Sequence, residues 1–360
     1  MILRMGFSRS DWRLIALATV ATLAAAVTYY GRIGGSISPF IISAISLALL
    51  ASLVGRSVEG LGDRLGAGAT GVLQSALGNL PELFVVLFAL KAKLYEVATA
   101  TIVGSILANV LLVLGLAFLV GGIKNGTQTF GQGSAKTISM LLVLSVGALL
   151  VPALTASLHT PAAGHERALS IIVSILLLGL FAASLPASLK RQEAEHHTPD
   201  EEQALGAPSW PLWVAIGMLA VTGVGAAFVS DWFVGGLTPA MDSLGISQTF
   251  AGLVIVAIAG NAVENVVGIQ LAARNQSDYA LSVILQSPLQ ITLVVAPALV
   301  LLSPLVGASF TLVLSPLLIA VLILAVVVTV IVVLDGESNW LEGAALIVLY
   351  GIIAAAFWWG

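Results

Sequence analysis

Charged side chains are scarce in this sequence. It has 18 Asp and Glu and 14 Lys and Arg among 360 residues, so 9% of the residues are charged. Soluble domains carry roughly 25% charged residues. So few charges cannot cover a surface that faces water, which excludes a soluble globular enzyme. Cysteine is absent, which excludes disulfides, thiolate metal sites and cysteine nucleophiles.

Two other functional classes lack their residues. The basic side chains form no stripe or patch interleaved with aromatic rings, so nucleic-acid binding has no support. A membrane-embedded hydrolase needs a serine with a histidine, paired aspartates or a metal triad at membrane depth, whereas all four histidines lie in polar breaks: His159, His165, His196 and His197. We therefore predict that the chain is not an enzyme and needs no cofactor.

Long apolar runs dominate what is present, and 59% of the residues are hydrophobic. A helix spans a bilayer with about 20 apolar residues. The seven tryptophans lie at or just beyond run ends, as expected for rings at the headgroup level. We predict an all-α polytopic membrane protein with eleven transmembrane helices, at about 14–31, 37–55, 65–90, 95–120, 136–158, 166–189, 210–230, 247–273, 278–302, 309–334 and 338–358.

The basic residues predict the orientation of these helices. Eleven spans put the two termini on opposite sides, and with the N-terminus inside, ten of the 14 Lys and Arg residues fall in inner segments. The positive-inside rule therefore predicts a multi-pass cell-membrane protein with a cytoplasmic N-terminus and an external C-terminus. The polar break 190–209 is then cytoplasmic. We interpret the first run as a retained helix, with a cleaved signal peptide as the alternative.

The sequence repeats itself at an offset of 182 residues. This shift aligns Gly78–Glu82 with Gly260–Glu264, and Ser105 with Ser287. Five spans separate the copies, and an odd number inverts one copy relative to the other, which is the architecture of many secondary transporters. The organisation predicted is an extra helix, two inverted five-helix repeats and a linker between them: 1–32, 33–189, 210–360 and 190–209, respectively.

Each repeat contains one isolated acid deep in a span. Glu82 is the only charged residue between Arg64 and Lys91, and Glu264 is the only one between Asp242 and Arg274. Ionisable groups at membrane depth are costly, so they are candidate functional groups. A glycine precedes each acid by four residues, and Pro81 precedes Glu82 directly. These residues favour discontinuous helices, which are tolerated in a membrane only beside protein or a wet cavity.

The polar residues near these acids carry amides and hydroxyls rather than imidazoles or thiols. They are Asn79 and Asn261 beside the acids, and Ser105, Asn109, Gln286, Ser287, Gln290 and Thr292 on the two partner spans. Oxygen donors suit Ca²⁺, Mg²⁺, Mn²⁺ or Na⁺. Two carboxylates balance one divalent cation, and Ca²⁺ tolerates an irregular ligand set better than Mg²⁺ does. We therefore predict a Ca²⁺ site at Glu82 and Glu264.

The motifs resemble those of a known family. Four segments resemble the two α-repeats of the calcium/proton exchangers, a branch of the cation/calcium exchanger superfamily: Gly78–Leu83, Gly104–Gly115, Gly260–Glu264 and Gln286–Ile291. The resemblance covers about 65–122 and 249–303 in detail. It implies eleven helices, arranged as one extra helix and two inverted five-helix repeats. It also implies export of Ca²⁺ driven by inward proton flow.

The resemblance also implies roles for particular residues. Glu82 and Glu264 become the central carriers of the cation and of protons, surrounded by Asn79, Asn261, Ser105, Ser287 and Gln290. The chain departs from the family pattern at Asn265, where the family usually has histidine, and at Gln286-Ser287-Pro288, where it has Gly-Ser-Ser. Leu80–Leu83 is also similar to the sodium/calcium branch. Sodium-coupled exchange and a broader cation/proton antiport therefore stay open as alternatives.

Acidic residues outside the spans are interpreted separately. Glu96 and Asp278 begin two spans, where acids suit the helix dipole, so we assign them a structural role. The linker carries five acids that a regulatory Ca²⁺ site could use, although a solvated linker is the favoured interpretation: Glu193, Glu195, Asp200, Glu201 and Glu202. The partners expected are Ca²⁺, H⁺ and the lipid bilayer, and a homo-oligomer is compatible with the sequence.

Overall fold

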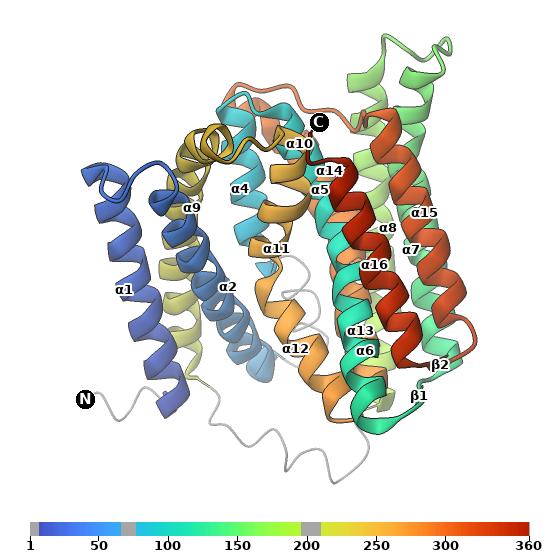
Figure 1. The fold of residues 1–360 in the computed structure, drawn as a ribbon. Coiled ribbons are helices and arrows are strands. Elements are labelled where there is room, and N and C mark those ends of the chain that lie inside the picture. Colours follow the sequence, from blue (N-terminus) through green and yellow to red (C-terminus); the bar gives the residue numbers. More distant parts are fainter. Residues whose placement is uncertain (1–6, 66–76, 196–209, 360) are drawn as a thin grey trace. The chain divides into compact units, whose positions relative to one another are not determined.

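The computed structural model describes residues 7–65, 77–195 and 210–359, and most of them are helical (Figure 1). The α-helices are α1 (Arg9–Gly31), α2 (Ser38–Leu65), α4 (Leu80–Lys91), α5 (Tyr95–Leu107), α6 (Leu114–Asn125), α7 (Gln132–Ser157), α8 (Glu166–Glu195), α9 (Leu212–Leu244), α10 (Gln248–Phe250), α11 (Ala257–Gly260), α12 (Ala262–Ala273), α13 (Ser277–Gln290), α14 (Ala296–Leu302), α15 (Pro316–Val333) and α16 (Trp340–Ala356). Three π-helical segments and one 3₁₀ turn complete the helices: η2 (Ala108–Val113), η3 (Ala251–Val256), η4 (Ile291–Val295) and η5 (Ser303–Val306). Strands β1 (Gln128–Thr129) and β2 (Glu337–Ser338) pair antiparallel.

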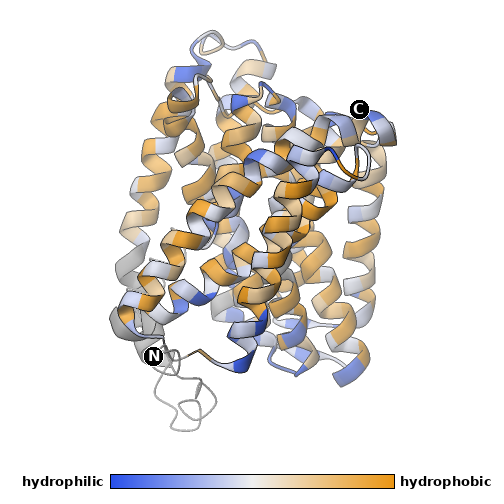
Figure 2. Ribbon diagram, turned by 90° about the vertical axis from the view of Figure 1, so that its left-hand side faces the viewer, coloured by the Kyte–Doolittle hydropathy of each residue, from blue (hydrophilic) through white to orange (hydrophobic). Residues whose placement is uncertain are grey.

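The helices have the length and composition of membrane spans. Eight helical segments in the described part of the chain have at least 18 residues and an apolar window with few charges. Two shorter apolar segments accompany them, Gln248–Gly260 and Trp340–Ala356. In Figure 2 hydrophobic colours run along the helices, whereas hydrophilic colours gather at helix ends and connections. The structure therefore agrees with a polytopic helical membrane protein.

Some helix boundaries differ from those predicted. Helix α9 continues to Leu244, although the predicted run stops at position 230, before Asp231. A charged residue ends an apolar run but does not end a helix, because helical hydrogen bonds are indifferent to side-chain polarity. The predicted run 65–90 is described as helix only in part, since α4 begins at Leu80 and residues 66–76 lie outside the described chain.

The chain divides into two compact units, and each unit takes one stretch from each half of the sequence. Unit one comprises Met1–Phe88 and Gly179–Ser243, and unit two comprises Ala89–Leu178 and Leu244–Gly360. In unit one α1 packs along α2. The carboxylate of Asp11 in α1 pairs with Arg56 of α2 and accepts a hydrogen bond of 3.2 Å from the Trp210 indole N–H. These contacts fix the first helix against its neighbours.

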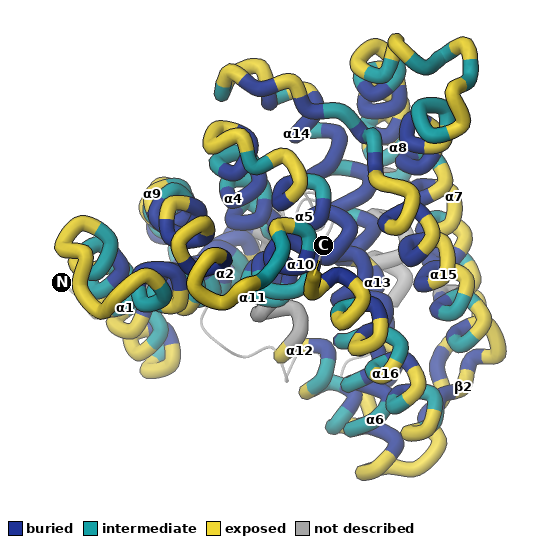
Figure 3. The backbone as a smooth tube through the Cα atoms, turned by 45° about the horizontal axis from the view of Figure 1, so that its top comes forward, coloured by how far each residue is buried: buried dark blue, intermediate teal, exposed yellow. Residues whose placement is uncertain are grey.

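Helix α5 forms much of the core of unit two. In the most apolar 18-residue stretch of Tyr95–Asn125, 72% of the residues are buried. Most of α5 is accordingly coloured as buried in Figure 3. Helix α5 crosses η3 closely, because Gly104 and Gly252 leave the space that a side chain would fill. A Cβ on Gly104 would collide with the backbone of Leu253, and one on Gly252 would lie 2.5 Å from the Val97 carbonyl oxygen. Small residues at such crossings are typical of membrane helices.

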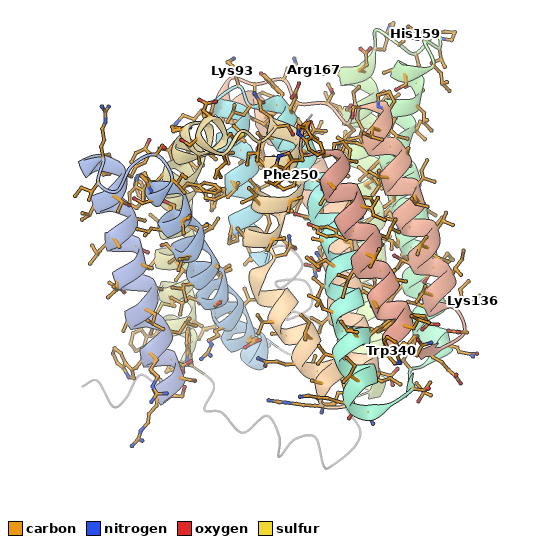
Figure 4. The ribbon with its side chains drawn as sticks, viewed as in Figure 1. Lys93, Lys136, His159, Arg167, Phe250 and Trp340 are labelled. Atoms are coloured by element: carbon orange, nitrogen blue, oxygen red, sulfur yellow. The ribbon has the colours of Figure 1, made fainter. Side chains whose placement is uncertain are left out.

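The connections of unit two alternate between its two ends. Lys93, His159 and Arg167 lie at one end, whereas Lys136 and Trp340 lie at the other (Figure 4). Within this unit, Lys93 and Arg167 therefore lie at the end opposite to Lys136.

Candidate ion-binding site

The first segment of the candidate site is the end of α5 and the π-turn η2 that continues it. Ser105 and Asn109 are four residues apart, so their side chains lie on the same helix face. They are 2% and 0% exposed, respectively. In η2 the Leu114 N–H donates to the Asn109 carbonyl, five residues back. Such π-turns are rare in proteins, and those that occur are often found at functional sites. The polar side chains around η2 are therefore candidate ion ligands.

The second segment is a break in a helix. Helix α11 ends at Gly260 and α12 begins at Ala262, with Asn261 between them at φ −92° and ψ 16°. The Asn261 backbone N–H donates to the Ala257 carbonyl at 3.2 Å, and its side-chain Nδ2 donates to the same oxygen at 2.9 Å. The side chain of Asn261 is thereby held against the last turn of α11, at the point where the helix is interrupted.

Four side chains from three segments of unit two form one buried hydrogen-bond network. Asn109 Nδ2 lies 3.1 Å from Asn261 Oδ1 and 3.2 Å from Ser287 Oγ. Asn261 Nδ2 donates to Ser105 Oγ at 3.0 Å, and Ser287 Oγ donates to Asn261 Oδ1 at 3.1 Å. Asn109 Nδ2 also lies 2.8 Å from the Ser105 carbonyl. Since Nδ2 has two hydrogens for these three acceptors, the network has more than one hydrogen-bonding arrangement.

The carbonyl oxygen of the Asn109 side chain is the unsatisfied acceptor of this network. Oδ1 is buried and has no hydrogen-bond partner within the described residues. A buried acceptor without a partner costs about 1–3 kcal/mol, so a fold that retains one has a reason to do so. An amide oxygen is a hard ligand of the kind that Ca²⁺ and Na⁺ take in proteins. The network thus offers a cation ligand that its internal hydrogen bonds leave free.

The first-repeat acid belongs to unit one and is described there by itself. Glu82 lies in the first turn of α4, and Asn79 directly precedes that helix. Both side chains are buried, at 5% and 3% exposed. The Leu83 N–H donates to the Asn79 carbonyl at 3.0 Å, which starts the helix at this asparagine. A carboxylate in the first turn is favoured by the positive end of the helix dipole.

The second repeat has the same local arrangement. Asn261 precedes α12, and Glu264 is the third residue of that helix. The side chain of Glu264 lies outside the described part of the structure. In both repeats an asparagine at a helix break is therefore followed by a glutamate in the first turn of the next helix.

The remaining predicted residues fall into two groups. Gln290 is the half-buried last residue of α13, immediately before η4. The linker acids lie outside what the structure describes: Glu193 and Glu195 belong to the last residues of α8 but their side chains are outside the described structure, and Asp200, Glu201 and Glu202 are outside it altogether. The structure thus groups Ser105, Asn261 and Ser287, and leaves the other assignments as predictions.

The role of Asn109 in this network could not be predicted from the sequence pattern alone. Asn109 was one polar side chain among several on its span, and the family resemblance gave it no role. The signal that could have found it is the four-residue spacing from Ser105, which places both on one helix face. Glu96 and Asp278, in contrast, occupy the first turns of α5 and α13 as predicted, and Asp278 Oδ1 accepts the Gly131 N–H at 2.6 Å.

Comparison with known families gives this geometry a context. The sequence pattern of the sodium/calcium exchanger protein family matches residues 35–190 and 214–359. The chain belongs to this exchanger family. The starts of α4 and α12 and all four network residues lie inside the matched ranges.

Similar proteins share almost the full length of the chain. The Ca²⁺/H⁺ antiporter of Synechocystis sp. is 33% identical over 341 residues, which cover 90% of this chain and 91% of the relative. The Ca²⁺/H⁺ antiporter ChaA of Bacillus subtilis is 34% identical over 326 residues, which cover 88% of this chain and 91% of the relative. The solved structure of native YfkE is similar with a TM-score of 0.80 and 31% identity, covering 96% of this chain and 99% of YfkE.

Proposed function

We propose that this exchanger family member is a secondary active antiporter that exports Ca²⁺ in exchange for H⁺ by alternating access. The observation that carries the proposal is its full-length similarity, at 33–34% identity, to proteins named Ca²⁺/H⁺ antiporters. The buried cluster of amide and hydroxyl groups supports it, because those oxygens are suitable ligands for Ca²⁺. The transported Ca²⁺ and H⁺ are substrates, and the mechanism requires no cofactor.

Two carboxylates explain how such a site couples two ions. We propose Glu82 and Glu264 as the carriers, following the family resemblance, with Asn79, Asn261, Ser105, Ser287 and Gln290 as further ligands. Two carboxylates that serve one cation at membrane depth cannot both stay charged once it leaves, because desolvation and mutual repulsion disfavour that state. The site then holds either the cation or protons. Alternating access to the two sides converts this rule into exchange.

The finer architecture proposed is one extra helix, 1–32, and two inverted five-helix repeats, 33–189 and 210–360, joined by the linker 190–209. Three observations support it: the 182-residue offset, the asparagine at a helix break in each half, and two π-turns at matching positions, η2 and η4. Each compact unit also combines a stretch from both halves, which suits interdigitated repeats.

The orientation proposed has a cytoplasmic N-terminus and an external C-terminus in a cell membrane. The supporting observation is the bias of basic residues, ten inside against four outside. In this orientation the acidic linker faces the cytoplasm, where we propose that it separates the two halves as a solvated segment.

Sodium-coupled exchange is the second candidate. It is favoured by the similarity of Leu80–Leu83 to the sodium/calcium branch, and by Asn265, which replaces a histidine that could handle protons. A broader cation/proton antiport is the related alternative, because an amide and hydroxyl site also suits Mn²⁺.

Transport in proteoliposomes separates these candidates. The purified protein is reconstituted into vesicles with an acidic lumen, and uptake of Ca²⁺, Mn²⁺, Mg²⁺ and Na⁺ is measured in turn, with a protonophore control. The proposal predicts Ca²⁺ uptake that requires the pH gradient and persists without Na⁺. Uptake that requires an outward Na⁺ gradient and ignores the pH gradient would establish the second candidate instead.

A further inference from the structure

One hydroxyl stands out in an otherwise aliphatic helix. Helix α15 reads PLLIAVLILAVVVTVIVV, and Thr329 is its single polar side chain. The residue is fully buried, at 0% exposed. A hydroxyl in such a place must find an acceptor, because burying it without one is costly.

Thr329 has two acceptors, although it needs only one. Its Oγ1 lies 2.8 Å from the Ala325 carbonyl, one turn back in its own helix, and 3.1 Å from the Val110 carbonyl in η2. The two carbonyls share the single hydroxyl proton, and donation to Ala325 alone would satisfy it. The second contact is therefore not required for burial, and its effect is on η2.

The carbonyl that Thr329 reaches belongs to the π-turn of the network. Val110 follows Asn109, whose side chain lies against Asn261 and Ser287. In η2 the helical hydrogen bonds reach five residues back instead of four, which widens the turn. A side chain bonded to a carbonyl in this turn holds the turn, and with it the Cα of Asn109, against α15.

The second repeat has an equivalent contact made by different residues. Shifting by 182 residues relates η2 to η4, and α15 to α7. Thr292 of η4 donates to Ser145 Oγ of α7 at 3.0 Å, and both side chains are fully buried. Ser145 and Thr329 are not at equivalent positions, since Ser145 shifts onto Val327. Hydroxyl hydrogen bonds thus link η2 to α15 and η4 to α7, each a helix of the other repeat, although sequence repetition does not impose it.

We propose that Thr329 and Ser145 are positioning residues: Thr329 holds η2 and Ser145 holds η4. Thr329 thereby keeps the Asn109 carboxamide in place for the cation. This inference rests on the proposed function, because it assigns the residues to the transport site. Both bonds are releasable, since the Thr329 hydroxyl can donate to the Ala325 carbonyl alone. The Thr292 hydroxyl can likewise donate to the Leu289 carbonyl at 3.0 Å, while Ser145 Oγ donates to the Leu142 carbonyl at 3.2 Å. A helix can therefore move away during transport without leaving a buried donor unpaired.

The test compares matched variants in proteoliposomes with an acidic lumen, using Ca²⁺ as the probe. Thr329→Val removes the hydroxyl at nearly constant shape, and Thr329→Ser retains it. Thr101→Val is the control, because Thr101 is a buried α5 residue whose hydroxyl donates only to the Val97 carbonyl among the described residues. Thermal unfolding in detergent reports whether each variant is folded.

The inference predicts that Thr329→Val raises the Ca²⁺ concentration for half-maximal uptake roughly three- to ten-fold, the effect of losing one hydrogen bond that positions a ligand. The maximal rate should change less than about two-fold, and Thr329→Ser and Thr101→Val should both resemble the wild type. Because Thr329 acts through Asn109, Thr329→Val should add nothing in an Asn109→Ala background. If Thr329→Val is unstable, Ser145→Ala tests the second contact with the same expected rise.

Three results would overturn the inference. They are an unchanged half-saturation in folded Thr329→Val or Ser145→Ala, an equal rise in Thr101→Val, and an additive effect of Thr329→Val on Asn109→Ala. Failure of the proposed function would look different, since the wild type itself would then show no Ca²⁺ uptake. In that event the same variants are compared with the cation that the wild type does carry.

Discussion

The two halves of the candidate site repeat their backbone more faithfully than their side chains. In both repeats a helix carries a serine and then passes into a π-turn, as α5 into η2 and α13 into η4. At the 182-residue offset, however, Asn109 of η2 corresponds to Ile291 of η4, and both are buried, at 0% and 1% exposed. The repeated backbone therefore supplies the breaks and turns, whereas the ligands at equivalent positions have diverged.

A second difference concerns packing. Gly104, before Ser105, allows α5 to cross η3 closely, whereas the equivalent position before Ser287 is the exposed Gln286. The backbone of Leu253 thus constrains the first-repeat segment at Gly104, whereas Gln286 is exposed in the described part of the chain. An antiporter with inverted repeats needs equivalent conformational changes in both halves but has no need for two equivalent ligand sets.

The carboxylates should be the symmetric element of this comparison. Glu82→Gln and Glu264→Gln should each reduce proton-driven Ca²⁺ uptake to the level of protein-free vesicles, because each removes one charge and one titratable proton from the carrier pair. Glu96→Gln is the matched control, since Glu96 lies in the first turn of α5 and should leave uptake intact. Retained uptake in either of the first two variants would remove that glutamate from the mechanism.

Substitutions at the two equivalent positions 104 and 286 should have very different effects. Gly104→Ala forces a Cβ onto the backbone of Leu253, and such overpacking costs about 1–3 kcal/mol of unfolding free energy. We expect a lower thermal midpoint in detergent and a loss of most Ca²⁺ uptake. Gln286→Ala, at the equivalent exposed position, should leave both unchanged. Equal effects of the two variants would show that the crossing does not distinguish the repeats.

Substitution of Asn109, whose counterpart in the second repeat is Ile291, should give the next largest effect. Asn109→Ala removes the amide oxygen that is available to a cation, and we expect the Ca²⁺ concentration for half-maximal uptake to rise about ten-fold or more, as for a lost bond to a charged group. Asn125→Ala is the control, because Asn125 Nδ2 donates at 3.2 Å to the Ala272 carbonyl at the end of α12. An unchanged half-saturation in Asn109→Ala would mean that the network is structural.

Much of the fold could be predicted from the sequence, because apolar length and charge position determine where helices cross a membrane. The helix starts after Asn79 and Asn261 could be predicted from the glycine four residues before each isolated acid and, in the first repeat, also from Pro81. The π-turns were not, since a shift of hydrogen bonds from four to five residues has no compositional signature. Asn109 and Thr329 gain their roles only through contacts between segments that are distant in the sequence.

Substitution of Asn265 should have a smaller effect, on the pH dependence of Ca²⁺ uptake, and it tests the position at which this chain departs from the family pattern. Asn265→His introduces a side chain that titrates near pH 6.5, beside Glu264 in sequence. Below that pH the added positive charge should oppose cation binding, so Ca²⁺ uptake should fall more steeply with acidification on the Ca²⁺-loading side than in the wild type. Asn265→Gln, which adds no titrating group, is the control. Identical pH profiles for all three proteins would place position 265 outside the proton path.

The linker should give the smallest effect. Replacing its five acids by glutamine keeps its length and removes its negative charges: Glu193, Glu195, Asp200, Glu201 and Glu202. Charge runs of this kind are usually solvated, so the maximal rate of Ca²⁺ uptake should change less than about two-fold. Complete loss of uptake in a well-folded variant would show that the linker is part of the transport machinery.

The most direct test of the central claim follows both ions in the same vesicles. Wild-type protein is reconstituted with a pH-sensitive dye in an acidic lumen, and lumenal pH and Ca²⁺ content are recorded together after external Ca²⁺ is added. Antiport predicts that Ca²⁺ entry raises the lumenal pH in a fixed ratio, and that Glu82→Gln abolishes both signals together. Ca²⁺ entry without any proton efflux, or with efflux unaffected by Glu82→Gln, would contradict the account.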